Sequence, residues 1–232
     1  MRRLIAGIVL AAAAGGFAAD WPMFRGGPDL IGVSPETLPD KPGLLWTFKT
    51  GGAVKSSAAV AGGKVYFGSS DNCIYALNLA DGVKAWSFKT EGEVESSPLV
   101  LEGKVFAGSS DNFLYALDAA TGKQVWKYET GDKILGAPNW FKAAGKTWVL
   151  AGSYDYKLHC VDAATGKSNW VYETGNYING SPAVAGGRSV FGGCDGMLHV
   201  VRLADGTEEK QVEAFVIRGS LMAGGDLHCT RG

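Results

Sequence analysis

The strongest constraint on this chain is a segment that it contains four times. The clearest copy is GSSDNFLYALDAATGKQVW, residues 108–126, and the others span residues 68–86, 152–170 and 192–210. Self-similarity at a period of about 40 residues is typical of repeat architectures, in which each unit is one supersecondary structure stacked on its neighbours. An Asp recurs near the start of each copy with spacings of 40, 44 and 40 residues, at Asp71, Asp111, Asp155 and Asp195.

The second copy and the residues around it contain four short apolar runs, at 95–101, 104–109, 113–118 and 123–130. These runs are rich in Val, Tyr, Phe and Trp and are separated by Gly or Asp-Asn turns, which is the pattern of antiparallel strands. Four such strands in about 40 residues predict one blade of a β-propeller. We therefore predict an all-β fold, a propeller of four-stranded antiparallel blades arranged as an open arc or incomplete ring.

The repeat boundaries divide the chain into a leader, an arm and a propeller region. We expect a signal peptide at 1–18, an N-terminal arm and linker at 19–43, and propeller repeats at 44–232. The blades are expected near 53–90, 93–130, 133–174 and 177–214, with a partial blade at 215–232. Trp46 lies 40 residues before Trp86, so residues 44–50 are expected to be the last strand of a blade whose first part is missing.

The leader has the features of a secretory signal. Arg2 and Arg3 precede an apolar stretch that runs from residue 4 to residue 14, and small residues follow, so cleavage is expected after Ala18. The apolar stretch is shorter than the roughly 20 residues that a membrane span requires. The sequence thus favours a periplasmic or extracellular protein with no membrane span once the signal is removed.

Residues that recur in every copy are expected to serve what the copies share, which is the fold. A Trp closes the first three copies and also stands before the first, whereas Lys210 replaces it in the fourth, and a Gly recurs in the turn before it. We interpret the Trp set and the Gly set as structural. The four repeated Asp residues are also interpreted as structural, because they are expected to cap turns. These sets are Trp46, Trp86, Trp126 and Trp170, and Gly82, Gly122, Gly166 and Gly206.

The segment from Ala116 to Trp126 resembles the tryptophan-docking motif of pyrroloquinoline-quinone-like (PQQ-like) propeller repeats: Ala, any residue, Asp or Asn, two of any kind, Thr-Gly, three of any kind, Trp. Residues 76–86 depart from it only by Asp81 in place of Thr, and residues 160–170 only by Cys160 in place of Ala. The resemblance covers roughly residues 44–228. It implies rings of seven or eight blades, and its family includes quinoprotein alcohol dehydrogenases and the propeller lipoprotein of the outer-membrane barrel-assembly machinery.

A quinone-dependent dehydrogenase, as the resemblance implies, needs a calcium ion held by Glu, Asn and Asp, a catalytic Asp and commonly two adjacent Cys residues. The sequence has no adjacent Cys pair, and its three histidines, His159, His199 and His228, form no pattern with the other residues. His159 and His199 are expected at repeat positions that differ by one residue. We therefore expect no catalytic, cofactor-binding or metal-binding residues, and no cofactor.

One position changes in every copy although its neighbours repeat. This position is expected to open the first strand of each blade and to line one face of the propeller. Variation on a fixed scaffold is what a recognition surface requires, although unconstrained solvated positions would vary in the same way. The residues are Lys55, Glu95, Leu135, Asn179 and Arg218.

The function predicted from these features is that of a non-catalytic propeller scaffold that binds a protein partner or ligand. A role in cell-envelope or outer-membrane protein assembly is a specific form of this prediction. The alternative is a fragment of a quinone-dependent dehydrogenase-like propeller. A formal net charge of −1 gives no reason to expect nucleic-acid binding. Open blade edges would allow self-association.

Two local expectations concern the cysteines and the third copy. The cysteines, Cys73, Cys160, Cys194 and Cys229, occupy different repeat positions, which favours buried thiols, although a bridge between Cys160 and Cys194 stays open. The third copy is four residues longer than the second, and the extra residues are expected to lengthen the hairpin between its first two strands. That hairpin could form a working face, or Trp140 and Trp148 could pair across it.

Overall fold

The computed structural model describes residues 20–37 and 40–214, and within these ranges it contains strands, turns and loops but no helix. The expected signal peptide at 1–18 and the expected partial blade at 215–232 lie outside the described residues. The sixteen strands form four separate four-stranded sheets. The first sheet consists of β1 (Ala59–Ala61), β2 (Lys64–Ser69), β3 (Cys73–Asn78) and β4 (Lys84–Lys89). The second consists of β5 (Leu99–Leu101), β6 (Lys104–Gly108), β7 (Phe113–Asp118) and β8 (Gln124–Glu129).

The third sheet consists of β9 (Asn139–Ala143), β10 (Lys146–Gly152), β11 (Lys157–Asp162) and β12 (Ser168–Glu173). The fourth consists of β13 (Ala183–Ala185), β14 (Arg188–Gly192), β15 (Met197–Arg202) and β16 (Glu208–Glu213). In every sheet the strands follow one another in chain order, and all neighbouring pairs are antiparallel. Each sheet is one propeller blade, which confirms the predicted all-β fold.

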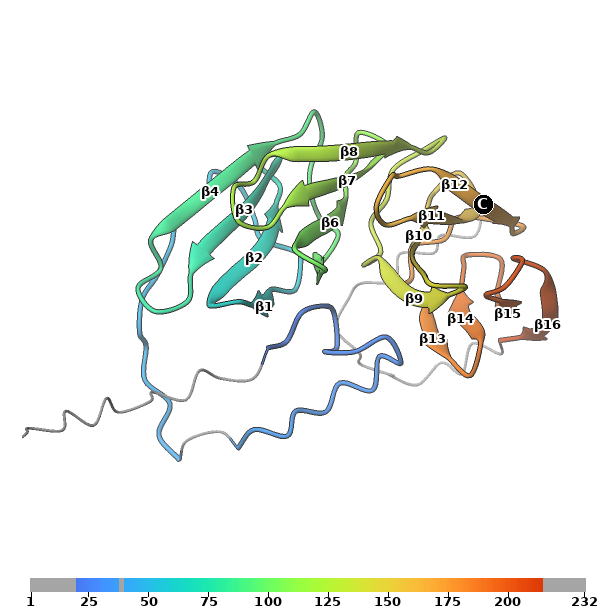
Figure 1. The fold of residues 1–232 in the computed structure, drawn as a ribbon, viewed down its shortest axis with the longest axis horizontal. Helices are drawn as coiled ribbons and strands as arrows, with labels where there is room; N and C mark the ends of the chain where they lie inside the picture. Colours follow the sequence, from blue (N-terminus) through green and yellow to red (C-terminus); the bar gives the residue numbers. More distant parts are fainter. Residues whose placement is uncertain (1–19, 38–39, 215–232) are drawn as a thin grey trace, which may run out of the picture.

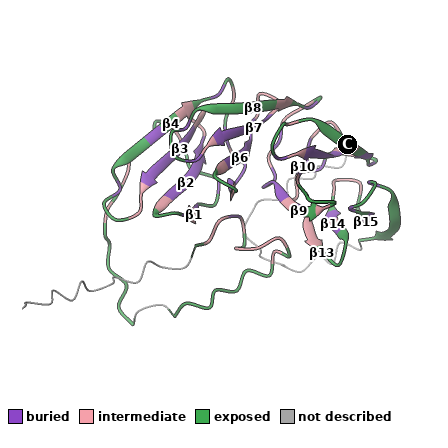
Figure 2. Ribbon diagram, in the orientation of Figure 1, coloured by how far each residue is buried: buried purple, intermediate pink, exposed green. Residues whose placement is uncertain are grey.

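The four blades stand side by side in an arc that does not close into a ring in the described part of the chain (Figure 1). The first strands, β1, β5, β9 and β13, line the inner edge of this arc, which we call the hub. The fourth strands, β4, β8, β12 and β16, form its outer rim, where most residues are exposed (Figure 2). The arc confirms the predicted incomplete propeller.

The first strands are shorter than the sequence predicted. We expected the first strand of the second blade to begin at Glu95, whereas β5 begins at Leu99, after Pro98. In three blades a proline directly precedes the first strand, at Pro98, Pro138 and Pro182. Proline has no amide hydrogen and cannot donate a hydrogen bond to a neighbouring strand. The preceding residues are held instead by side chains, as when the Ser96 hydroxyl donates to the Gly136 carbonyl at 2.8 Å.

Residues 44–50 do not form the strand that we predicted. They have no strand partner in the described part of the chain, because a fourth strand needs a third strand beside it and residues 40–43 provide none. They nevertheless lie against the first blade as a fourth strand would. The Trp46 Nε1 donates to the Leu79 carbonyl at 2.8 Å, and Phe48 packs edge-on against Phe67 and Tyr75.

The same indole contact joins every pair of neighbouring blades. Trp86 donates to the Ala119 carbonyl at 3.1 Å, Trp126 to Ala163 at 3.2 Å and Trp170 to Leu203 at 3.1 Å. Each ring also covers the glycine of that turn in the next blade. A Cβ added to Gly122 would lie 2.6 Å from the Trp86 ring, and Gly122 has a φ of 71°, so both space and backbone conformation exclude a side chain here.

A second contact joins the blades nearer the hub. The segment that connects one blade to the next inserts an apolar side chain against a glycine of the preceding blade's second strand. Cβ atoms added to Gly108 and Gly152 would lie 2.2 Å from Ile134 and 2.3 Å from Ile178. Both isoleucines are fully buried. The core therefore runs between blades, and one hydrophobic cluster contains Tyr66 and Trp86 from the first blade together with residues of the second.

The N-terminal arm lies along the hub and touches all four blades. Trp21 and Val60 of β1 exchange two backbone hydrogen bonds of 2.7 and 2.8 Å. The Pro22 carbonyl accepts from the Val100 amide of β5 at 2.7 Å. The Pro28 carbonyl accepts from the Asn139 side chain at the start of β9 at 2.7 Å and from the Val184 amide of β13 at 2.7 Å. In Figure 1 the arm runs inside the arc, where it satisfies amides at the inner edges of the first strands.

The longer third copy lengthens the hairpin of β9 and β10, as predicted, but the two tryptophans do not pair across it. Trp148 lies opposite Phe141, and Trp140 lies opposite Val149. Because successive side chains of a strand point to opposite faces, the two rings enter different clusters, Trp140 with the second and third blades and Trp148 with the third and fourth. The disulfide between Cys160 and Cys194 is also absent, since Cys160 is a buried free thiol.

We predict that Gly122→Ala destabilises the protein more than Gly103→Ala. Both glycines have positive φ, 71° and 73°, so both substitutions carry the left-handed backbone cost of about 1–2 kcal/mol. Only Gly122 faces an indole, whereas nothing lies within 4 Å of a Cβ at Gly103, and this overpacking adds about 1–3 kcal/mol. Urea denaturation of the two variants measures the difference. Equal free energies of unfolding would contradict the role of the Trp86 contact.

We predict that the Cys160 thiol does not react with a soluble disulfide reagent in the native protein. Burial raises the pKa of Cys160 to about 12, and only the thiolate reacts. Labelling with 5,5′-dithiobis(2-nitrobenzoate) at pH 8, followed by peptide mass spectrometry, is expected to find Cys160 unmodified until denaturant is added. Native-state labelling as fast as that of the half-buried Cys73 would show that the third and fourth blades separate readily.

Candidate functional site

The repeated Asp residues join neighbouring blades at the face where the second strand of each blade turns into the third. The Oδ2 of Asp111 accepts from the Glu91 amide at 2.9 Å, and the Oδ2 of Asp155 accepts from the Gly131 amide at 2.8 Å. The Oδ1 atoms of the same residues accept from amides of their own turns, Phe113 at 3.2 Å and Lys157 at 3.1 Å. The carboxylates of Asp111 and Asp155 therefore cap their turns and hold the segments that connect the preceding blades to their own.

The same carboxylates hold a residue four positions later, and this residue differs between the two halves of the arc. Tyr75 and Tyr115 donate their hydroxyls to Asp71 and Asp111, both at 2.8 Å. In the third blade the Nε2 of His159 lies 3.0 Å from Asp155 Oδ2, and in the fourth the Nε2 of His199 lies 2.9 Å from Asp195 Oδ2. Our expectation that the two histidines occupy different repeat positions is wrong, since both follow the Asp by four residues.

Each histidine also contacts a tyrosine of the preceding blade. The Tyr128 hydroxyl lies 3.1 Å from His159 Nδ1, and the Tyr172 hydroxyl lies 3.0 Å from His199 Nδ1. For His159, a neutral imidazole that donates from Nε2 to Asp155 can accept the Tyr128 proton at Nδ1. The Tyr172 hydroxyl donates instead to the Glu208 carboxylate, so its one proton is not available to His199. We did not predict these tyrosines from the sequence, although a pattern marks them. Two residues after the repeat Trp there is a Tyr in each blade whose next blade has a histidine. In the first blade, whose next blade has Tyr115 instead, the same position is Phe88.

The surroundings of Asp155 keep its carboxylate charged, and those of Tyr115 keep its phenol neutral. Burial works against the charge of Asp155, but the hydrogen bonds from His159 and the Gly131 amide outweigh it and lower the pKa of this carboxyl. Burial, together with the hydrogen bond to Asp111, raises the pKa of Tyr115 well above its ordinary value. Both effects match a structural network between blades.

The predicted recognition residues lie in the segments that connect the blades, on the same face as the Asp turns. They do not open the first strands as predicted, since β1, β5, β9 and β13 begin four residues after Lys55, Glu95, Leu135 and Asn179. Lys55 is exposed, and Glu95, Leu135 and Asn179 are half-buried. Arg218 lies outside the described residues.

Two of these residues contact each other. The Lys55 Nζ lies 2.6 Å from Glu95 Oε1 and 3.8 Å from Glu93 Oε2. The hydrogen bond and charge of Glu95 raise the pKa of Lys55, so the ammonium stays protonated at neutral pH. An exposed ion pair of this kind contributes about 0–1 kcal/mol. At this variable position the first two blades therefore carry a pair of opposite charges, whereas the last two carry the uncharged Leu135 and Asn179.

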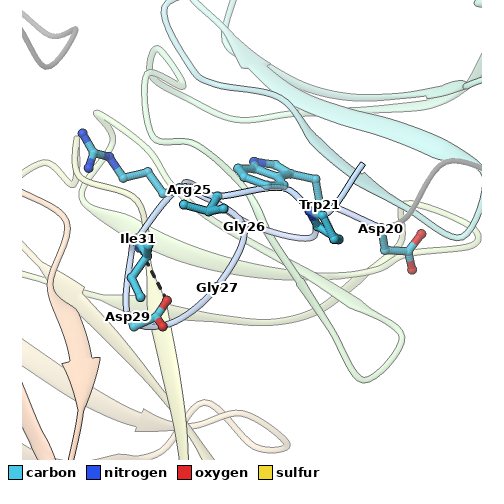
Figure 3. Close-up of a pocket in the computed structure, with 10 residues that line it drawn as sticks. Asp20, Trp21, Arg25, Gly26, Gly27, Asp29 and Ile31 are labelled. Carbon is cyan, nitrogen blue, oxygen red and sulfur yellow. Dashed lines mark hydrogen bonds between the residues drawn. The ribbon is translucent and has the colours of Figure 1, made fainter. Parts of the chain in front are cut away.

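Two hollows lie away from this face. The first, with a volume of about 300 Å³, is formed within the N-terminal arm itself and is lined by residues that include Trp21, Arg25, Gly26 and Asp29 (Figure 3). The Trp21 ring lies over Gly26, where a Cβ would be 2.8 Å from the indole. The arm is thus a folded loop braced by its own tryptophan.

The second hollow, of about 520 Å³, lies beside the β9–β10 hairpin. Its charged groups neutralise each other: Lys142 Nζ lies 3.1 Å from Glu102 Oε1, and Lys146 Nζ lies 3.5 Å from Asp162 Oδ2. The Thr147 hydroxyl also donates to Glu102 at 2.9 Å. The hairpin of the third blade therefore clamps the turn of the second, which gives the insertion a structural role.

The described residues do not fit a quinone cofactor with its calcium ion. Residues 20–37 and 40–214 contain no group of three or more His, Cys, Asp or Glu side chains arranged to hold a metal ion. The hub is filled by the arm, whose Met23 is 1% exposed. Most oxygens of the repeated Asp carboxylates are already engaged by amides, phenols and imidazoles, and only Asp71 Oδ1 has no hydrogen-bond partner among the described residues.

No helix in residues 20–37 or 40–214 combines the length and the apolar character that crossing a membrane requires.

Comparison with known proteins supports the repeat interpretation. A family model described as "Outer membrane protein assembly factor BamB" matches residues 39–139 and 135–214, which together exceed half of the chain. Comparison of the sequence with curated proteins gave no match.

Several solved structures share the fold. BamB from Moraxella catarrhalis superposes with a TM-score of 0.64 at 20% identity, over 73% of this chain and 52% of that one. The quinohemoprotein alcohol dehydrogenase from Comamonas testosteroni gives a TM-score of 0.71 at 20% identity, over 84% of this chain and 42% of that one. A computationally designed protein, Ika8, gives 0.60 at 17% identity, over 67% of this chain and 48% of that one. This chain therefore spans about half the length of these proteins, and the likeness shows the fold alone.

We predict that the aromatic partners at the blade junctions are coupled. His159→Tyr places at the third blade the tyrosine of the first two blades but leaves the Tyr128 hydroxyl without its acceptor, which costs about 1–3 kcal/mol. Adding Tyr128→Phe reproduces the junction of Phe88 with Tyr115 and is expected to recover most of that loss. A double-mutant cycle by urea denaturation measures the coupling. Additive effects of the two substitutions would contradict it.

Proposed function

The chain belongs to the family described as outer membrane protein assembly factor BamB, and from this premise we propose that it is a non-catalytic scaffold that binds a protein partner in the cell envelope. A secreted location, periplasmic or extracellular, is part of the proposal and rests on the leader at 1–18. The partner class follows from the family description, which names the assembly of outer-membrane proteins.

The observation that carries this proposal is the contrast between fixed and variable positions on one face. The Asp turns and the connecting segments are held in every blade by the same hydrogen bonds, from the Gly51 amide to Asp71 at 2.7 Å through to the Gly175 amide to Asp195 at 3.2 Å. Lys55, Glu95, Leu135 and Asn179 stand on this frame with four different chemistries. A rigid frame that presents varied side chains suits recognition of another protein.

The alternative function, part of a quinone-dependent dehydrogenase, is favoured by one observation, the TM-score of 0.71 with the Comamonas testosteroni enzyme. Two features of the described residues weigh against it. The hub, where a central ligand would sit, holds the arm, and the buried carboxylates are engaged in blade contacts. Calorimetric titration with pyrroloquinoline quinone and calcium separates the two functions, because tight saturable binding would support the dehydrogenase and exclude a purely scaffolding role.

We predict that the variable face forms the contact with the partner. A photo-crosslinking amino acid placed at Glu95 or Asn179 in envelope-localised protein is expected to form a covalent adduct with an envelope polypeptide, identified by mass spectrometry. The same group at Lys123, which lies in an exposed turn between the third and fourth strands, is the matched control and is expected to give none.

The combined variant Lys55→Ala, Glu95→Ala, Asn179→Ala, Arg218→Ala tests the same face without a crosslinker. It is expected to keep the Tm of the wild type, because the side chains of Lys55, Glu95 and Asn179 are exposed or half-buried and the Lys55–Glu95 pair is solvated. It is expected to lose the partner, which co-purification measures. A variant that retains the partner, or adducts of equal yield at Lys123, would contradict recognition through this face.

A further inference from the structure

Three tyrosines form a cluster at the junction of the third and fourth blades, on the same face as the variable residues. The rings of Tyr154 and Tyr177 are stacked, with centroids 4.7 Å apart and planes 27° apart. Tyr156 meets Tyr177 edge-on at 5.1 Å. Tyr156 and Tyr177 are each 38% exposed. We call Tyr154, Tyr156 and Tyr177 the tyrosine cluster.

The cluster is specific to this junction. Tyr154 precedes the repeat Asp, where the other blades have Ser70, Ser110 and Cys194. Tyr177 belongs to the connecting segment and its carbonyl accepts from the Cys194 amide at 2.9 Å; the residues with the same hydrogen bond elsewhere are Ala53, Glu93 and Lys133. The frame does not require an aromatic side chain at these positions, since the other junctions form without one.

Tyr156 carries a conformational cost that the other blades avoid. Its φ is 72°, and the residues at the same turn position are Asn72 at 65°, Asn112 at 72° and Gly196 at 76°. Asn and Gly adopt this left-handed conformation readily, whereas a bulky side chain does so at a cost in free energy. Strained residues of this kind concentrate at functional sites. The Tyr156 ring therefore stands where stability alone would favour Asn or Gly.

The rings of the cluster already attract one cation. The Lys133 ammonium already lies 4.5 Å from the centre of the Tyr154 ring, so a cation–π contact forms in the cluster itself. A hydrogen bond with Tyr177 raises the pKa of the Tyr156 hydroxyl, and the negative charge of Asp132 adds to the rise. The cluster thus combines aromatic faces with one ammonium, that of Lys133, and one carboxylate, that of Asp132.

We propose that the tyrosine cluster is the binding site for an arginine side chain of the protein partner. A guanidinium group is planar, stacks on aromatic faces and can donate at the same time to phenol and carboxylate oxygens. Exposed Tyr and Arg are the residue types that anchor protein interfaces. Single-stranded nucleic acid also stacks on tyrosines but requires a basic groove, and a chain of net charge −1 with Asp132 beside the cluster does not offer one. The proposal rests on the proposed scaffold function, since it names the chemistry of the partner.

The test uses the full chain labelled with 3-fluorotyrosine and the heptapeptide Ser-Gly-Arg-Pro-Arg-Gly-Ser as the probe. Peptide addition at millimolar concentration is expected to shift the fluorine resonances of Tyr156 and Tyr177, which single substitutions assign. The same peptide with citrulline in place of arginine, which keeps the shape but not the charge, is expected to shift neither.

The double variant Tyr156→Asn, Tyr177→Lys installs the residues of the preceding blade at both positions. It is expected to weaken peptide binding about tenfold or more while its Tm stays equal or rises, because Asn suits the left-handed turn. A merely structural role for Tyr156 would instead lower the Tm. Asn112→Gly, at the same turn position in the second blade, is the control and is expected to bind the peptide as the wild type does.

No resonance shift, an equal shift with the citrulline peptide, or unchanged binding by the double variant would each overturn the proposal. The photo-crosslinked adducts separate this proposal from the scaffold function. If the double variant still forms the Asn179 adduct in full yield, the scaffold function stands and the arginine site is wrong. If the wild type forms no adduct but binds the arginine peptide as described, the arginine site stands and the scaffold function is wrong.

Discussion

The contact between an indole and the glycine turn of the next blade is the interaction on which the rest of the structure depends. A four-stranded blade has two apolar faces and cannot cover either of them alone. Trp46, Trp86, Trp126 and Trp170 each reach across to the following blade and donate to its turn. Stability is therefore a sum over neighbouring blades, as in other repeat proteins. Residues 44–50 keep this contact although they form no strand, which shows that docking on the next blade does not require pairing within the preceding one.

On the frame built by these contacts, one position that varies from blade to blade lies on the face of the Asp turns. The repeated carboxylates hold the turns and the connecting segments there, and they accept from Tyr in two blades and from His in the other two. The side chains between these fixed points divide the face into a region of paired charges at Lys55 and Glu95 and an aromatic region at Tyr154, Tyr156 and Tyr177. The two ends of the arc thus offer different chemistry on one frame.

The repeat period was enough to predict the blades, because strand, turn and Trp positions recur and each copy supports the others. The sequence was less informative where structure depends on a missing neighbour. The alternation at residues 44–50 is that of a strand, but no third strand lies beside it. The Tyr154–Tyr177 stack joins residues from a turn and a connecting segment, so no local pattern marks it. From the sequence we placed the two histidines at repeat positions one residue apart. Counting from the Asp of each copy shows that both follow it by four residues, which is the position that contacts the carboxylate.

The N-terminal arm has a consequence for how the chain reaches this structure. In a simple repeat array every contact is between adjacent units, so contact order is low and units can assemble one after another. The arm breaks that rule, because Pro28 and Asn139 are 111 residues apart in sequence and yet hydrogen-bonded. Its seat is complete only when the third and fourth blades are in place. Closing so long a loop has an entropic cost that slows the formation of this contact. The arm therefore joins the four blades into a single cooperative unit, and the last step of folding involves the first described residues.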